Sequence, residues 1–120
     1  MKLEELMLND WVLYNGNPCK VARISERLFL EKDEKVFYAP IEKITPLPLT
    51  KEILEKNGWK YNPTIKAYEW QHEAFYISIN LDEKTRIYVV NDYIFGMALG
   101  AVHELQHALR LCGIEKTINL

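Results

Sequence analysis

The chain has 120 residues, of which 48% are hydrophobic, 27% charged and 12% aromatic, and its formal net charge is −2. A chain of this size buries about two-thirds of the surface that it exposes when unfolded, and so apolar a composition excludes a disordered protein. The slightly acidic balance gives no overall attraction to phosphate backbones or to anionic lipid, although it leaves room for a local basic patch.

The N-terminal third carries the signals of short strands joined by tight turns. Asn15-Gly16, between two strand-like runs, predicts a hairpin because both residues tolerate the positive φ that a tight turn requires. A second hairpin is predicted over residues 27–38, and a last short strand at 41–44. We expect these strands to form a small β-barrel of the Src-homology-3-like or Tudor-like kind over residues 1–45.

Two prolines mark the clearest boundary in the chain. Pro46 and Pro48 favour extended backbone and interrupt both helices and central strands. We therefore expect a proline-rich linker at 46–50 and a second, α+β part over 51–120. Each part alone is near the size at which a core becomes marginal, so the two are expected to pack together.

The second part is predicted to begin with a short helix, for which Thr50 is the N-cap and Asn57-Gly58 the stop. Apolar and aromatic runs separated by turn residues then predict an antiparallel meander over residues 59–95. A final helix is predicted over roughly 99–111. Its apolar stripe should cover the sheet and consists of Ala98, Val102, Leu105, Leu109 and Cys112.

One motif carries recognisable chemistry: His103-Glu104-Leu105-Gln106-His107 matches the pattern H-E-x-x-H. Residues four apart lie one above the other on a helix, so His103 and His107 can hold one Zn²⁺ while Glu104 acts as the general base on the bound water. Over these five residues the chain resembles the zinc metallopeptidases called zincins. The alternative function is therefore a minimal zinc-dependent hydrolase.

The helical wheel favours a different interpretation of the same residues. His103, Gln106, His107 and Arg110 fall within an arc of about 100°, opposite the apolar stripe. This arrangement predicts a solvated polar face, on which replacing Gln106 or Arg110 costs little. The positive charge of Arg110 opposes a dication. A third ligand would have to be Glu115 or come from strand ends, as His72, Asp82 or Asp92, and no spacing requires any of them. We therefore expect no catalytic residue, no metal ligand and no cofactor.

Three segments carry a resemblance that spans most of the chain. They are Val102-His103-Glu104-Leu105-Gln106-His107-Ala108-Leu109, Asp10-Trp11-Val12 with Asn15-Gly16-Asn17-Pro18, and Pro46-Leu47-Pro48-Leu49-Thr50 with Asn57-Gly58-Trp59. They are similar to a group of short proteins without an established activity from gut Bacteroidetes, their phages and mobile elements. The group's recurring helix is V-H-x-L-Q without the second histidine, which implies that the zincin match is incidental.

Aromatic residues in the barrel are the candidates for partner binding, as a groove for a peptide or a modified lysine, although such residues often form a barrel core instead. The candidates are Trp11, Tyr14, Phe37 and Tyr38, with Phe29 beside them. Lys20, Arg23 and Arg27 either contact phosphate or form a solvated edge. The sequence thus predicts a non-catalytic accessory or adaptor protein that binds another protein or a nucleic acid.

The expected location is the cytoplasm. Cys19 and Cys112 lie far apart and belong to no C-x-x-C pair, which predicts two free thiols. The N-terminus has acidic residues where a signal peptide needs its apolar core, and no run of about 18 apolar residues predicts a membrane span. We expect no membrane partner, and the oligomeric state is not indicated.

Overall fold

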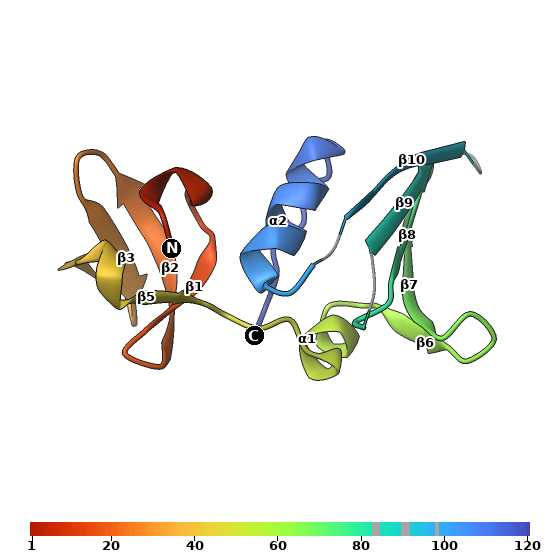
Figure 1. The fold of residues 1–120 in the computed structure, drawn as a ribbon, viewed down its shortest axis with the longest axis horizontal. Coiled ribbons are helices and arrows are strands. Elements are labelled where there is room, and N and C mark those ends of the chain that lie inside the picture. Colours follow the sequence, from red (N-terminus) through yellow and green to blue (C-terminus); the bar gives the residue numbers. More distant parts are fainter. Residues whose placement is uncertain (83–84, 90–91, 98) are drawn as a thin grey trace. The chain divides into compact units, whose positions relative to one another are not determined.

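The computed structural model describes residues 1–82, 85–89, 92–97 and 99–120. The chain divides into two compact units, one of Met1–Pro48 with Ala101–His107 and one of Leu49–Gly100 with Ala108–Leu120. Within the described residues there are two five-stranded antiparallel sheets and two α-helices, which confirms the predicted α+β class (Figure 1). None of the described helices is long and apolar enough to cross a membrane.

The first sheet begins with the predicted hairpin. Strands β1 (Trp11–Tyr14) and β2 (Asn17–Ile24) pair antiparallel, with Tyr14 opposite Asn17. Only Asn15 and Gly16 lie between them, with φ angles of 50° and 77°. Both turn residues therefore adopt the left-handed conformation that a two-residue hairpin needs and that Asn and Gly reach at low cost.

The second hairpin is also present. Strands β3 (Leu28–Lys32) and β4 (Lys35–Ala39) are joined by Asp33 and Glu34, whose φ angles are 52° and 65°. This turn has no glycine, so two side-chain-bearing residues hold the left-handed conformation.

The fifth strand returns to the first. A 3₁₀ turn at Ile41–Lys43 leads into β5 (Ile44–Pro46), which pairs with β1 and gives the strand order β4-β3-β2-β1-β5. Among the described ladders none joins β4 to β5, so hydrogen bonding leaves the sheet open rather than closed into a barrel.

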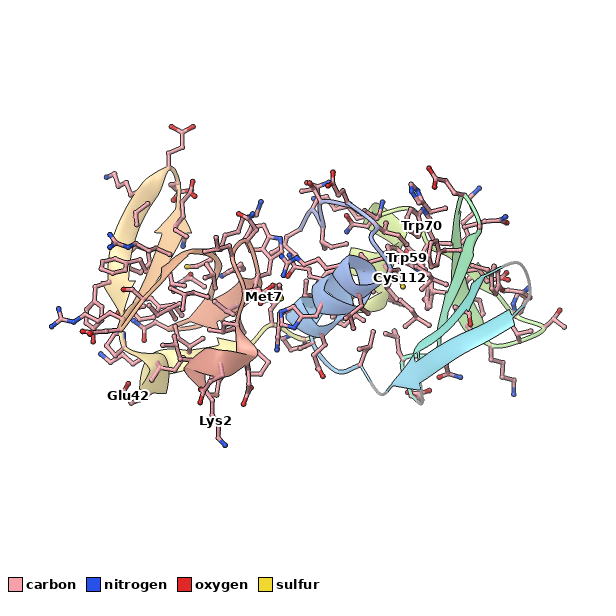
Figure 2. All side chains as sticks on the ribbon, turned by 90° about the horizontal axis from the view of Figure 1, so that it is seen from above. Lys2, Met7, Glu42, Trp59, Trp70 and Cys112 are labelled. Carbon is pink, nitrogen blue, oxygen red and sulfur yellow. The ribbon has the colours of Figure 1, made fainter. Side chains whose placement is uncertain are left out.

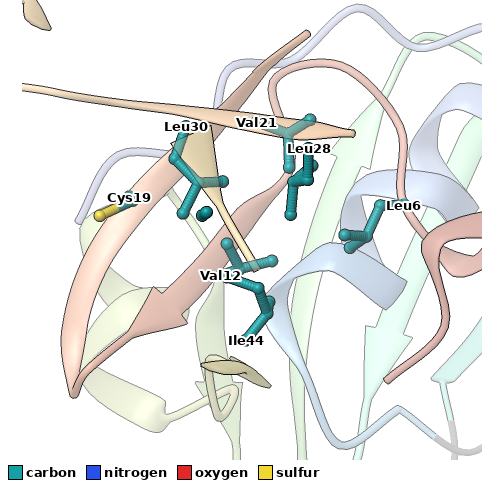
Figure 3. Packing of buried hydrophobic residues seen from close by; sticks show 8 residues of the cluster. Leu6, Val12, Cys19, Val21, Leu28, Leu30 and Ile44 are labelled. Atoms are coloured by element: carbon teal, nitrogen blue, oxygen red, sulfur yellow. The ribbon is translucent and has the colours of Figure 1, made fainter. Parts of the chain in front are cut away.

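One face of this sheet encloses a hydrophobic core, shown in Figure 3. Alternate residues of the strands point into it because successive side chains of a strand point to opposite faces. Tyr14 and Phe37 are partly buried against the core, with their ring centroids 5.4 Å apart. The fully buried members are Leu6, Val12, Cys19, Val21, Leu28, Leu30, Ala39 and Ile44.

The second unit begins as predicted. Helix α1 (Lys51–Lys56) is capped by Thr50, whose Oγ1 accepts a hydrogen bond of 3.3 Å from the Ile53 N–H. Gly58 follows the helix with φ of 98°, the conformation that glycine adopts most readily after a helix.

An antiparallel meander fills most of the rest of this unit and confirms the prediction for residues 59–95 where the structure describes them. Its strand order is β10-β9-β8-β7-β6, so each strand pairs with its neighbours in sequence. The strands are β6 (Lys60–Asn62), β7 (Ala67–His72), β8 (Phe75–Ile79), β9 (Thr85–Val89) and β10 (Asp92–Met97).

Helix α2 (Val102–Leu111) starts later than its predicted beginning near residue 99. Ala101 forms a β-bridge with Pro48, and the Val102 N–H donates a hydrogen bond of 2.8 Å to the Leu47 carbonyl. Ala101 therefore belongs to a β-bridge, and the helix begins at the next residue. The segment 46–50 is likewise ordered by pairing, since Pro46 ends β5 and Pro48 forms this bridge.

The end of α2 follows the prediction, and the leucines of its apolar stripe are buried. Gly113 has φ of 72°, and the Ile114 N–H donates to the Leu109 carbonyl at 2.9 Å, which satisfies a carbonyl of the last turn. Leu105 and Leu109 are both fully buried. Ala98, the first member of the predicted stripe, lies outside the described residues. The boundaries of the units divide α2, with residues up to His107 in the first unit.

Candidate functional site

Two of the four residues of the predicted polar face of α2 are buried and the other two are partly buried, so the expectation of a solvated face was wrong. His103 is 6% exposed and Gln106 7% exposed. The Gln106 side chain accepts a hydrogen bond from the Trp11 N–H and donates one to the Asn9 carbonyl, both at 2.9 Å. A buried amide is stable only when its polar atoms are paired, and the backbone before β1 supplies the partners.

Asp10 provides the second polar contact to this face. Its side chain is completely buried, and Oδ2 accepts a hydrogen bond of 2.8 Å from the Met7 N–H. The same oxygen lies 2.6 Å from Nε2 of His107. With the carboxylate ionised, the imidazole is the donor, because a carboxylate only accepts. Nε2 of His107 is therefore engaged by a carboxylate.

His103 lies beside this pair. Its ring centroid is 5.5 Å from that of His107, with the planes at 79°. Its Nδ1 is buried, and within the described residues it has no hydrogen-bond partner. Burial lowers the pKa of His103 below its usual value; the Asp10 carboxylate opposes this shift, and the neighbouring His107 adds to it. The arrangement favours a neutral imidazole.

The zinc alternative needs a third ligand beside His103 and His107. In the part of the chain that the structure describes, no three His, Cys, Asp or Glu residues come together as a metal site. Asp10 contacts His107 through a direct hydrogen bond, and Glu104 is half-buried on the same helix. His107 and Gln106 thus form a polar contact between α2 and the start of β1.

The four aromatic candidates for partner binding do not form one groove. Tyr14 and Phe37 point inward and pack on the core of the first unit. Trp11 and Tyr38 belong to the opposite face, because Trp11 precedes the inward-facing Val12 and Tyr38 follows Phe37. Of the four candidates, only Trp11 and Tyr38 lie on the outer face of the sheet.

The outer face of β2, β3 and β4 combines aromatic rings with guanidinium groups. Phe29 and Tyr38 lie opposite each other, with ring centroids 6.2 Å apart in an edge-on arrangement. The guanidinium carbon of Arg23 is 5.5 Å from the Phe29 ring centroid, and that of Arg27 is 5.6 Å from the Tyr38 ring centroid. We call these four residues the arginine-aromatic face. Tyr38 is 51% exposed.

The next row of the same sheet face is different. Lys20 lies above the Trp11 ring, with Nζ 5.0 Å from the centroid. Glu31 stands directly opposite Lys20 in the register of β2 and β3. An acidic residue therefore accompanies the cation here, whereas Arg23 and Arg27 lie over aromatic rings.

The sequence contained a signal for this face that the initial grouping of aromatic residues missed. Neighbouring residues of a strand point to opposite sides, so Phe37 and Tyr38 could not share a surface. The pairing of Phe29 with Tyr38 follows from the short Asp33-Glu34 turn, which fixes the register. The positions of the two arginines over these rings required the three-dimensional structure.

No protein-family model matches the chain, and no curated protein or solved structure does. The support for a function therefore comes from the arginine-aromatic face and from the buried contacts of α2.

Proposed function

We propose that this protein is a non-catalytic binding module and that its arginine-aromatic face binds single-stranded nucleic acid. The observation that carries the proposal is the row Arg23, Phe29, Tyr38 and Arg27, in which two guanidiniums lie over two neighbouring rings. Proteins that hold single strands combine cations for the backbone with aromatic rings on which bases stack.

The charges of the face support an anionic ligand. Among the residues that the structure describes, neither Arg23 nor Arg27 forms an ion pair with a carboxylate. A guanidinium presents several N–H donors in a plane and suits phosphate oxygens. The two arginines are thus held in place by the rings while their donors remain available to a phosphate.

The rings distinguish nucleic acid from an acidic peptide. An acidic peptide would engage the guanidiniums by charge and would gain little from the exposed ring of Tyr38. A nucleobase has a flat face that stacks on such a ring, a contact worth about 1–3 kcal/mol per base. The exposure of Tyr38 beside the two arginines therefore favours single-stranded nucleic acid as the ligand.

The contacts of α2 support a structural rather than a catalytic role for the H-E-x-x-H segment. His107 binds the Asp10 carboxylate, and Gln106 binds backbone groups of Asn9 and Trp11. These side chains fasten the helix to the start of β1. An accessory or adaptor role fits a chain whose motif residues serve its own packing.

The test is fluorescence anisotropy with a labelled oligothymidine of about 12 nucleotides, a length within the range of about 4–16 nucleotides that one OB fold covers. Wild type should bind, and the double variant Arg23→Gln, Arg27→Gln should bind more weakly, with the slope of log K against log salt reduced by about 1.4. Tyr38→Ala should weaken binding by about 1–3 kcal/mol and leave the slope nearly unchanged.

A matched control removes two positive charges elsewhere. Lys51→Gln, Lys60→Gln changes the net charge by the same amount at exposed positions of α1 and β6. It should bind like wild type. Equal weakening by the two double variants, or no binding at low salt, contradicts the proposal. Binding of an acidic peptide that tolerates Tyr38→Ala would assign the face to a protein partner instead.

A further inference from the structure

Two tryptophans of the second unit form a compact aromatic cluster. Trp59, directly after Gly58, is 1% exposed, and Trp70 lies on β7; their ring centroids are 5.1 Å apart. Figure 2 shows the two side chains next to each other. The His72 ring, two residues further along β7, stacks on Trp70 with centroids 5.3 Å apart and planes at 19°.

A cation occupies this cluster. Nζ of Lys116 lies 4.7 Å from the Trp70 ring centroid and 5.7 Å from that of Trp59. Within the described part of the chain, Lys116 forms no ion pair with a carboxylate. Burial lowers the pKa of Lys116, because the ammonium has lost hydration. The indole faces are therefore the groups that stabilise this positive charge.

The backbone around Lys116 is fixed on both sides. Ile114 and Ile118 are both buried. Further on, the Asn119 N–H donates to Asn57 Oδ1 at 2.8 Å, and Asn57 Nδ2 donates to the Asn119 carbonyl at 2.7 Å. The tail is thus fastened beside α1, and the lysine between the two isoleucines is held over the rings.

The indole of Trp59 contacts Lys116 through its ring face and not through its N–H group. Its Nε1 is buried and, in the part of the chain described by the structure, has no hydrogen-bond partner. Leaving a buried donor unpaired costs free energy, and a buried tryptophan normally finds an acceptor. The ring faces of Trp59 and Trp70 nevertheless meet the ammonium of Lys116.

The edge of the cluster at His72 is partly exposed to solvent. The His72 side chain is 41% exposed, and Glu73, which is exposed, has its carboxylate 3.9 Å from Nε2 of His72. A carboxylate at the entrance attracts cations and repels anions. A ligand reaching the rings from this edge meets negative charge first and aromatic faces next.

We propose that Trp59, Trp70 and His72 form a binding site for an organic ammonium ion, and that the side chain of Lys116 is its internal occupant. Aromatic cages that recognise methylated lysine and choline select quaternary ammonium in this way, because such a cation keeps its charge but is weakly hydrated. The ligand class is therefore a methylated ammonium group. Access to the site depends on withdrawal of the Lys116 side chain.

The experiment follows the indole N–H signals of the full chain by two-dimensional NMR during titration with tetramethylammonium chloride, with sodium chloride at equal ionic strength as reference. In Lys116→Met the signals of Trp59 and Trp70 should shift and saturate. Wild type should need at least about tenfold more tetramethylammonium, because its binding-competent state is only fractionally populated. Lys116→Arg keeps a cation over the rings and should respond like wild type.

Two controls separate a cation site from a merely apolar one. The neutral compound 3,3-dimethyl-1-butanol has a tert-butyl group similar in size to a quaternary ammonium, and it should leave the signals of Lys116→Met unchanged. Adding Trp70→Leu to Lys116→Met should abolish the response. If Lys116→Met fails to fold, the same titration is carried out with Lys116→Gln.

Three results would overturn the proposal. They are no saturable shift in either neutral Lys116 variant, an equal response of wild type and Lys116→Met, and equal binding of the neutral compound. The site lies in the second unit, and the proposed nucleic-acid face lies in the first. Failure of one proposal therefore leaves the other unaffected.

Discussion

The two units place cations over aromatic rings in opposite settings. In the first unit, Arg27 is exposed and covers the ring of Tyr38, which is half-exposed. In the second unit, Lys116 covers Trp70 and the buried Trp59. Such a contact contributes about 0.5–1 kcal/mol at an exposed site and about 2 kcal/mol or more where water is excluded.

This difference shows that a contact between a cation and an aromatic ring can either leave the ring available to a ligand or stabilise the fold. An exposed ring with an arginine remains available for stacking and for phosphate. A buried ring pair with a lysine fixes a segment of the chain, and a ligand must displace that lysine to reach the rings. Substitutions in both units test this contrast between an exposed and a buried aromatic cluster.

The largest effect is expected at the tryptophan pair. Trp59→Ala should lower the free energy of unfolding by about 3–5 kcal/mol, because it leaves a cavity in the core of the second unit. Phe29→Ala, on the outer face of the first sheet, should lower it by only about 1 kcal/mol or less. Urea denaturation at neutral pH measures both. Equal losses would contradict the distinction between a buried and an exposed aromatic cluster.

The apolar stripe of α2 should contribute to the free energy of unfolding through residues of both units. Leu105 belongs to the first unit and Leu109 to the second, and both are fully buried. Each leucine-to-alanine change should cost about 2–5 kcal/mol in denaturant unfolding. Leu111→Ala is the control, since Leu111 is 77% exposed and its replacement should change stability by no more than about 0.5 kcal/mol. A control loss as large as the other two would contradict the assignment of the helix faces.

The next largest loss of stability is expected from replacing a buried side-chain amide, Gln106 in the first unit or Asn57 in the second. Gln106→Ala removes the hydrogen bonds to the Trp11 N–H and the Asn9 carbonyl, and Asn57→Ala removes the hydrogen bonds to Asn119. Each change should cost about 1–3 kcal/mol, because buried polar groups lose their partners. Thermal unfolding of both variants measures the loss. A neutral result for Gln106→Ala would restore the solvated-face interpretation of α2.

The smallest effect is expected from pH and concerns His103. Its pKa is lowered in the folded state, so the unfolded chain binds a proton more readily once the pH falls below the usual value of about 6.5. The contribution of His103 to the free energy of unfolding is therefore complete above about pH 6.5 and is lost as the pH falls below it. The limiting slope for one proton is about 1.4 kcal/mol per pH unit.

The measurement compares wild type with His103→Gln between neutral and mildly acidic pH. The charged groups that act on His103 are Asp10, His107, Glu104 and Glu5, and all four remain in the variant. The difference in unfolding free energy between the two proteins should shrink as the pH falls. Parallel curves would show that His103 does not titrate with the folding reaction.

Local signals predicted much of the fold. The Asn15-Gly16 pair gave the first hairpin, and Thr50 gave the N-cap of α1, because both depend on conformational preferences of a few adjacent residues. The meander and the end of α2 at Gly113 followed from the same kind of signal. Alternation along β4 also contained the separation of Phe37 from Tyr38, although the initial grouping of aromatic residues did not use it.

The burial of the polar helix face could not be predicted in this way. Gln106 is separated from Trp11 by 95 positions and from Asn9 by 97. On a helical wheel, a glutamine with two histidines is typical of a solvated surface. Backbone groups from a distant segment complement it here, and no local pattern reports such a partner. The same holds for Lys116 over the two tryptophans.

The first unit is made of two stretches of chain, Met1–Pro48 and Ala101–His107, with most of the second unit encoded between them. During synthesis, at roughly 5–20 residues per second, seconds pass between the emergence of Asp10 and that of His107. Throughout this interval the first strands lack the helical residues that pair with Asn9, Asp10 and Trp11. The N-terminal unit can therefore complete its folding only after residues up to His107 have left the ribosome.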